Sequence, residues 1–168
     1  MARLGRAYRA LRGGADREPF RPVAELRRDA VAFDGGPEIR GAVCWKSLAT
    51  GKGPCASLFV LDEEVLRFDC FGPGDGHYHV AVTAPGPEPR RRLYLHEATV
   101  DEQIERTVHE LTRNLPAYLR YHPRAEVRRC KVDAARMEQL AAEIRERMLH
   151  LLDTVPELAD LPRRSTGR

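Results

Sequence analysis

Hydrophobic and polar residues alternate along the first half of the chain, from about residue 26 to residue 96. A period of two is typical of strands that bury one face. Clusters rich in glycine, proline and aspartate interrupt the alternation, and such clusters are typical of turns. The pattern therefore predicts strands near residues 26–33, 40–47, 55–61, 65–71, 77–83 and 91–96.

The connections between these predicted strands are short. A parallel pair of strands needs a long crossover, whereas antiparallel neighbours are joined by tight turns. One predicted turn is Asp34–Pro37, and another is Thr50–Pro54, whose Gly51-Lys52-Gly53 run we interpret as a flexible hairpin loop. The first half of the chain is thus expected to form an antiparallel β-meander of about six strands.

The second half of the chain changes to a helical period. Thr99 and Glu102 form a capping box, a typical helix start, and Asp133 is a good N-cap for a second helix. Pro116 is expected to kink or end the first helix. The segment Glu126–Lys131 between the helices fits either an edge strand or a loop. The apolar stripes of the two helices are Val100, Ile104, Val108, Leu111 and Leu115, and then Met137, Leu140, Ile144, Met148 and Leu151.

Strands followed by helices are typical of the α+β class, so we expect two C-terminal helices packed on one face of the sheet. The 168 residues are 42% apolar and 32% charged, which is typical of a folded chain. We divide the sequence into a basic extension at residues 1–20, one α+β domain at residues 21–160 and a disordered tail at residues 161–168.

The sequence also predicts a cytoplasmic location. It contains no apolar run of about 18 residues, the length from which a membrane span is predicted. Its basic start is not followed by the apolar segment of a signal peptide. Both observations favour a cytoplasmic protein.

Positive charge is concentrated at the two ends of the sequence. The net charge is +3, yet residues 1–21 alone hold six arginines against two acids, and residues 163–168 add three arginines. Residues 22–162 have 19 basic and 23 acidic side chains. A fold that binds nucleic acid normally carries its positive field on the body. Nucleic-acid binding is therefore expected only through the basic tails.

The four cysteines do not form a recognisable motif. They are Cys44, Cys55, Cys70 and Cys130, and no two have the CxxC spacing of zinc knuckles or thioredoxin-like sites. We expect reduced, buried thiols, with Cys55 and Cys70 at core positions.

The fourth and fifth predicted strands place residues that can bind a ligand or a metal on one face. Their apolar residues must meet on the core face, and pairing Phe68 with Val80 achieves this. The same register places Asp69 directly opposite His79, with His77 beside them. This second face is expected to be exposed to solvent.

The sixth predicted strand adds three polar residues to the same face. Because its leucines are expected to point to the core, Arg92, Tyr94 and His96 should share the outer face with His77 and His79.

Histidines two residues apart on a strand can converge on one ion, and imidazole suits Zn, Cu, Fe and Ni. His77 and His79 are therefore the candidate ligands of a divalent transition metal, and either His96 or Asp69 is expected to complete the set. The candidate ligand-binding residues are Asp69 as an orienting partner, and Tyr94 and Arg92 for an anionic group. Two alternatives stay open: acid–base chemistry by the same histidines without a metal, and a solvated face on which Asp69 and His79 form a cross-strand charge pair.

The function that these features favour is a small soluble ligand- or metal-binding domain with its histidine-rich site on the exposed sheet face. Enzymatic activity at this site stays open, and no catalytic residue is identified. The alternative is a non-catalytic interaction protein or accessory subunit that uses the sheet face, the sheet edge or the arginine tail. The expected partner is a small molecule or a protein, and a homodimer is compatible with both functions.

Overall fold

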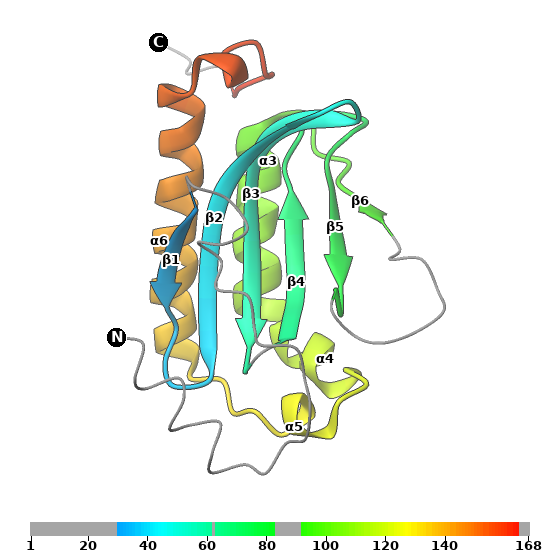
Figure 1. Ribbon diagram of the computed structural model, residues 1–168, viewed down its shortest axis with the longest axis vertical. Helices are drawn as coiled ribbons and strands as arrows, with labels where there is room; N and C mark the ends of the chain where they lie inside the picture. The colour runs from blue at the N-terminus through cyan, green and yellow to red at the C-terminus, as the bar shows by residue number, and fades with distance from the viewer. Residues whose placement is uncertain (1–29, 62, 83–91, 165–168) are drawn as a thin grey trace.

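The computed structural model describes residues 30–61, 63–82 and 92–164. Six antiparallel strands form one sheet in chain order, each paired with the next (Figure 1). The meander predicted from the alternation is therefore confirmed. The strands are β1 (Val31–Asp34), β2 (Ile39–Leu48), β3 (Gly51–Val60), β4 (Glu63–Asp69), β5 (His77–Val80) and β6 (Leu93–Tyr94).

The helices follow the strands along the chain and cover one face of the sheet (Figure 1). The long helix α6 packs against β1, β2 and β3 as well as against α3. This arrangement confirms the α+β class. The helical segments are α3 (Val100–His109), a π-helical turn (Glu110–Asn114), α4 (Leu115–Arg120), α5 (Ala125–Arg128), α6 (Ala134–Thr154) and a 3₁₀ turn (Pro156–Leu158).

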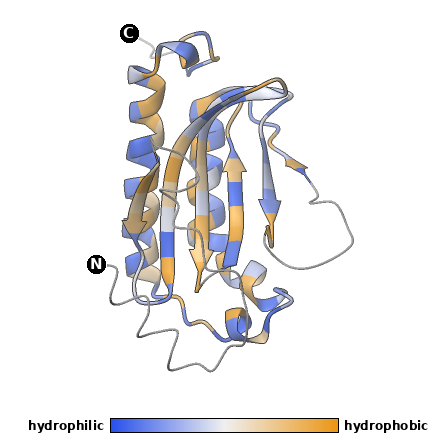
Figure 2. Ribbon diagram, in the orientation of Figure 1, coloured by the Kyte–Doolittle hydropathy of each residue, from blue (hydrophilic) through white to orange (hydrophobic). Residues whose placement is uncertain are grey.

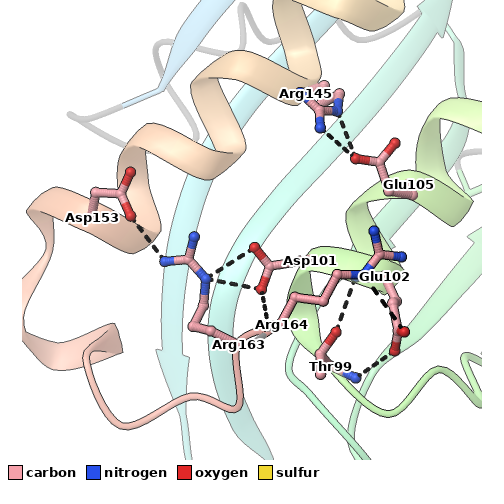
Figure 3. Close-up of polar contacts among 8 residues, drawn as sticks. All are labelled: Thr99, Asp101, Glu102, Glu105, Arg145, Asp153, Arg163 and Arg164. Atoms are coloured by element: carbon pink, nitrogen blue, oxygen red, sulfur yellow. Dashed lines mark hydrogen bonds and ion pairs between the residues drawn. The ribbon is translucent and has the colours of Figure 1, made fainter. Parts of the chain in front are cut away.

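Both predicted helix starts are confirmed. The Thr99 side chain accepts a hydrogen bond from the Glu102 N–H while the Glu102 carboxylate accepts one from the Thr99 N–H, as a capping box requires (Figure 3). Asp133 accepts a hydrogen bond from the Arg136 N–H at the start of α6. These side chains satisfy donors that have no partner within the helix.

The core lies between the sheet and the helices. Apolar residues form stripes along the elements that face it (Figure 2), and Leu58, Phe68 and Ile144 are almost completely buried there. α6 approaches β2 closely, because a Cβ at Gly41 would lie only 2.8 Å from Cδ1 of Ile144. Every apolar residue of the two predicted helical stripes except Val108 is buried, and Val108 packs against the core.

Two predictions about the helical half need correction. The expectation that Pro116 ends the helix is wrong, because α3 continues through the π-helical turn into α4 and Pro116 lies in the first turn of α4. A kink at Pro116 stays a prediction. The segment Glu126–Lys131 is neither an edge strand nor a simple loop, since its first residues belong to the short helix α5.

The Gly51-Lys52-Gly53 run is strand and not a flexible loop. β3 begins at Gly51, and the turn before it is at residues 49–50. The backbone directly after β4 passes very close to this run, as a Cβ at Gly53 would lie only 2.1 Å from the carbonyl oxygen of Cys70. Glycine is therefore required at this position for close strand packing.

Arg163 and Arg164, which fall in the predicted disordered tail, are bound to the helices. Arg163 donates hydrogen bonds to Asp101 and Asp153, and the Arg164 N–H donates one to Asp101 (Figure 3). These contacts tie the end of the described chain to α3 and α6. The predicted extension at residues 1–20 and residues 165–168 lie outside the described residues. Among the described helices, none combines the length and the apolar character that crossing a bilayer would need.

Candidate functional site

The observed register of β4 and β5 differs from the predicted one by two residues. Asp69 pairs with His77, and Arg67 pairs with His79. The prediction that Asp69 lies opposite His79 is therefore wrong. Because a shift of two residues keeps every side chain on its face, Asp69 and both histidines still share the face away from the helices.

A single transverse row of residues crosses five strands on this face. Each member is the direct cross-strand partner of the next. The row consists of Cys44, Cys55, Asp69, His77 and Tyr94.

The two buried cysteines that were assigned to the core lie on opposite faces of the sheet. Cys55 is buried beside Asp69 in the transverse row, so it does not occupy the predicted core position. Cys70 keeps the predicted core position and contacts the Thr107 hydroxyl of α3 at 3.5 Å. Burial raises the pKa of Cys70 to about 12, so its thiol stays protonated.

The centre of this face is buried, which contradicts the expectation of an exposed site. Only 4% of Asp69, 4% of His77 and 6% of His79 is accessible to solvent. Polar side chains removed from water need hydrogen bonds, ion pairs or ligands to offset the lost hydration. The three residues therefore require partners, and their geometry shows which ones they have.

The two imidazoles converge on one carboxylate oxygen. Nε2 of His77 lies 3.5 Å from Oδ2 of Asp69, and Nε2 of His79 lies 3.8 Å from the same oxygen. The other ring nitrogen of His77, Nδ1, lies 2.7 Å from the Asp75 carbonyl oxygen. Since a carbonyl only accepts hydrogen bonds, Nδ1 carries a proton and donates it. In a neutral ring, Nε2 then has a lone pair that faces Asp69.

His79 is held neutral by its surroundings. Burial lowers its pKa, and the nearby Arg67 guanidinium lowers it further, to about 4. Its Nδ1 is buried and has no hydrogen-bond partner among the described residues. Packing therefore orients the His79 ring, whereas a backbone carbonyl orients the His77 ring.

Lys46 fixes the other oxygen of the carboxylate. Its Nζ donates to Oδ1 of Asp69 at 2.6 Å, which leaves Oδ2 turned towards the histidines. Burial raises the pKa of Asp69, but Lys46, the Cys55 thiol and Arg67 together outweigh this effect and hold the pKa below its usual range. Asp69 is therefore an anion at neutral pH.

A hollow of about 410 Å³ opens over this cluster. Its wall combines three cationic side chains, one carboxylate, the two histidines and a few uncharged residues. The residues that line it are Lys46, Leu48, Thr50, Arg67, Asp69, Phe71, His77, His79 and Arg92.

The structure gathers most of the predicted site residues, but not all of them. Tyr94 is half-exposed beside His77, with ring centroids 6.2 Å apart, and Arg92 lines the hollow. His96 is exposed, lies beyond the end of β6 and is outside the group of ligand atoms that Asp69, His77 and His79 form.

The sequence analysis did not identify Lys46, Arg67 and Cys55 as part of the site. Lys46 and Cys55 come from β2 and β3, and only the pairing of all the strands brings them to Asp69. Arg67 lies two residues before Asp69 in β4, so the alternation of the strand already placed it on the same face.

Comparison of the chain with known proteins gives no family model, curated protein or solved structure that matches it. The function is therefore argued from the geometry of the site alone.

Proposed function

We propose that the protein binds a divalent transition metal ion through Oδ2 of Asp69 and the Nε2 atoms of His77 and His79. The observation that carries this proposal is the hydrogen bond from Nδ1 of His77 to the Asp75 carbonyl. Metal-binding histidines characteristically donate their second N–H in this way, because the bond fixes the tautomer and the orientation of the ring.

The donor set supports the proposal chemically. With Nδ1 of His77 protonated, a neutral ring directs a lone pair at a carboxylate oxygen, and two electron-pair donors repel unless a proton or a cation lies between them. Nε2 of His79 lies 3.8 Å from the same oxygen and is a third atom that could coordinate the cation. Two imidazoles and a carboxylate are ligands of Zn²⁺ and of non-haem Fe²⁺.

The spacing of the donors also supports a single ion. Ligands about 2.1 Å from a tetrahedral Zn²⁺ lie about 3.4 Å from one another. The two measured nitrogen–oxygen distances are 3.5 and 3.8 Å, and all three ligand atoms lie within 4.8 Å of one another. Only small side-chain movements would therefore close the site around an ion.

Three protein ligands leave at least one coordination position for water or another ligand, as catalytic metal sites do. That position would face the hollow, which Thr50, Arg67 and Arg92 line. The bound ion would act as a Lewis acid there. Lys46 would continue to hold the second oxygen of Asp69 and so orient the carboxylate.

The test is titration of chelator-treated protein with Zn²⁺ and Co²⁺, followed by calorimetry and by the visible absorption of bound Co²⁺. We expect one ion per chain and a rise in the melting temperature on binding. Loss of an outer-shell partner typically costs 10–100-fold in affinity, so His77→Gln and Asp69→Asn should each cost more than about 100-fold. His109→Gln is the matched control, because His109 is exposed on α3.

Circular dichroism must show that each variant is folded before its affinity is compared. The proposal is wrong if folded wild-type protein binds neither ion, or if His77→Gln and Asp69→Asn bind as tightly as the His109→Gln control.

The other functions predicted from the sequence remain predictions. They are acid–base chemistry without a metal, protein interaction as an accessory subunit, homodimer formation, nucleic-acid binding through the tails and a cytoplasmic location.

A further inference from the structure

The charge of the hollow suggests what else binds there. Three cationic side chains line it, namely Lys46, Arg67 and Arg92, against the single carboxylate of Asp69. A divalent ion would add two more positive charges at the floor. Like charges repel one another most strongly where they are removed from water, and only 21% of the Lys46 side chain and 21% of the Arg67 side chain is exposed. An anion bound next to the ion would offset this repulsion.

Arg67 offers a hydrogen bond that the described residues do not accept. Its Nε is buried and has no hydrogen-bond partner among them. Its contacts with carboxylates of the described residues are ion pairs, at 3.6 Å from Nη1 to Glu64 and at 3.8 Å from Nε to Asp69, and both distances are longer than a normal hydrogen bond. A buried donor without an acceptor is costly, so an acceptor bound in the hollow would stabilise the site.

The rest of the wall favours an organic ligand over an inorganic ion. Leu48 and Phe71 line the hollow beside the charged groups, and the exposed apolar surface is mainly that of Leu48, since 56% of Leu48 but only 4% of Phe71 is exposed. An inorganic anion would leave this apolar surface uncovered, whereas a carbon skeleton would bury it. The volume of about 410 Å³ lies within the range of small-molecule sites.

We propose that the hollow binds a small organic acid as its carboxylate, and this inference rests on the metal site proposed above. One carboxylate oxygen completes the coordination of the metal ion, and the other accepts the Nε–H of Arg67. Arg92, on the rim, pairs with the carboxylate or with a second acidic group. The carbon skeleton lies mainly against Leu48.

The experiment uses Co²⁺-loaded protein and matched pairs of probes: benzoate against benzamide, succinate against succinamide, and inorganic phosphate. We expect each acid to change the visible absorption of Co²⁺ and to bind at least about tenfold more tightly than its amide. Arg92→Gln, at an exposed position, should weaken the binding of each acid to the Co²⁺-loaded protein about tenfold and change the binding of its amide much less. Arg67→Gln should have a larger effect, and Arg113→Gln, exposed on the π-helical turn, should have none.

The outcomes separate this inference from the proposed metal site. Co²⁺ binding with no preference of any acid over its amide would overturn the organic-acid inference alone. Phosphate binding as tightly as the acids would also overturn it, since the apolar wall would then have no role. A chain that binds no Co²⁺ would overturn the metal site and this inference together.

Discussion

Nζ of Lys46 lies 2.6 Å from Oδ1 of Asp69, across the width of β3. The pair is largely buried, with 21% of the lysine side chain and 6% of the aspartate side chain exposed. It neutralises the only carboxylate in the lining of the hollow and turns the second oxygen of that carboxylate towards His77. The two residues come from strands that are not neighbours in the sheet.

Replacing Lys46 with methionine should therefore destabilise the metal-free protein. The variant leaves a buried carboxylate without its cation, and a hydrogen bond to a charged group contributes about 1.5–3 kcal/mol. The pKa of Asp69, now held low by Lys46, should rise. Zn²⁺ should stabilise Lys46→Met more than it stabilises the wild type, because the ion then supplies the missing positive charge. Urea unfolding with and without Zn²⁺ measures both effects.

Lys52→Met is the control for this prediction. Lys52 pairs with Asp160 at 2.7 Å, but 71% of that aspartate side chain is exposed. Exposed pairs contribute about 0–1 kcal/mol, so this variant should stay close to the wild type. Equal losses in the two variants would show that the Lys46–Asp69 pair contributes no more than a surface pair.

His122 should make the stability of the protein depend on pH. Burial lowers its pKa, and Arg124 and Arg128 lower it further, although Glu63 opposes them. The folded chain thus keeps His122 neutral at a pH where an unfolded histidine, with a pKa of about 6.5, takes up a proton. Its contribution to stability is complete above pH 6.5 and declines as the pH falls towards the lowered folded-state pKa.

The variant His122→Asn isolates this contribution. Nδ1 of His122 accepts a hydrogen bond from the Arg124 N–H, and an asparagine oxygen can take its place without titrating. We expect the free energy of unfolding of His122→Asn to change less than that of the wild type between pH 6.5 and pH 5, measured on metal-free protein. If the free energy of unfolding of His122→Asn changed with pH as much as that of the wild type, the prediction would be wrong. His109→Asn, at an exposed position, is the reference variant.

Among the polar residues of the helices, Glu110 is expected to contribute most to the free energy of unfolding. It is completely buried at the start of the π-helical turn. Its carboxylate accepts hydrogen bonds from the Tyr118 hydroxyl at 2.6 Å, the Asn114 amide at 2.7 Å and the Arg106 guanidinium at 2.7 Å. The Arg106 side chain is 44% exposed and can be solvated when its partner is removed, so the loss comes mainly from the hydrogen bonds of Tyr118 and Asn114. Each hydrogen bond to a charged group contributes about 1.5–3 kcal/mol, so Glu110→Ala should destabilise the protein more than Tyr118→Phe does in urea unfolding.

Two further variants calibrate this loss. Tyr118→Phe removes one charged hydrogen bond and should cost about 1.5–3 kcal/mol. Glu105→Ala removes the acceptor of an exposed ion pair with Arg145 (Figure 3) and should cost less than about 1 kcal/mol. A loss for Glu110→Ala no larger than that for Glu105→Ala would mean that the π-helical turn is stable without its buried carboxylate.

The alternation of side chains predicted which residues of β4 and β5 share a face, and this prediction does not depend on the exact register. Asp69, His77 and His79 stay together although the true register differs from the predicted one by two residues, because the strand period is also two. The residues that pair across the hairpin could not be predicted, because the register depends on the connection between the two strands. β4 ends at Asp69, and the connection that follows is stabilised by a hydrogen bond from the Gly76 N–H to the Gly72 carbonyl.

The limits of β6 were also not visible in the sequence. The alternation extends to His96, but the paired strand ends at Tyr94, so His96 does not join the group formed by Asp69, His77 and His79. A periodic pattern shows where a strand is possible, whereas its length depends on how many residues of the neighbouring strand offer hydrogen-bond partners.

The sequence by itself determined the α+β class, the order of the strands, the starts of both helices and the face on which Asp69, His77 and His79 lie. Each of these follows from local patterns: alternation, short turns and capping residues. Only the tertiary structure decided that this face is buried at its centre and that Lys46 and Cys55 lie beside Asp69. Such contacts depend on the pairing and bending of strands far apart in the chain, which no local pattern encodes.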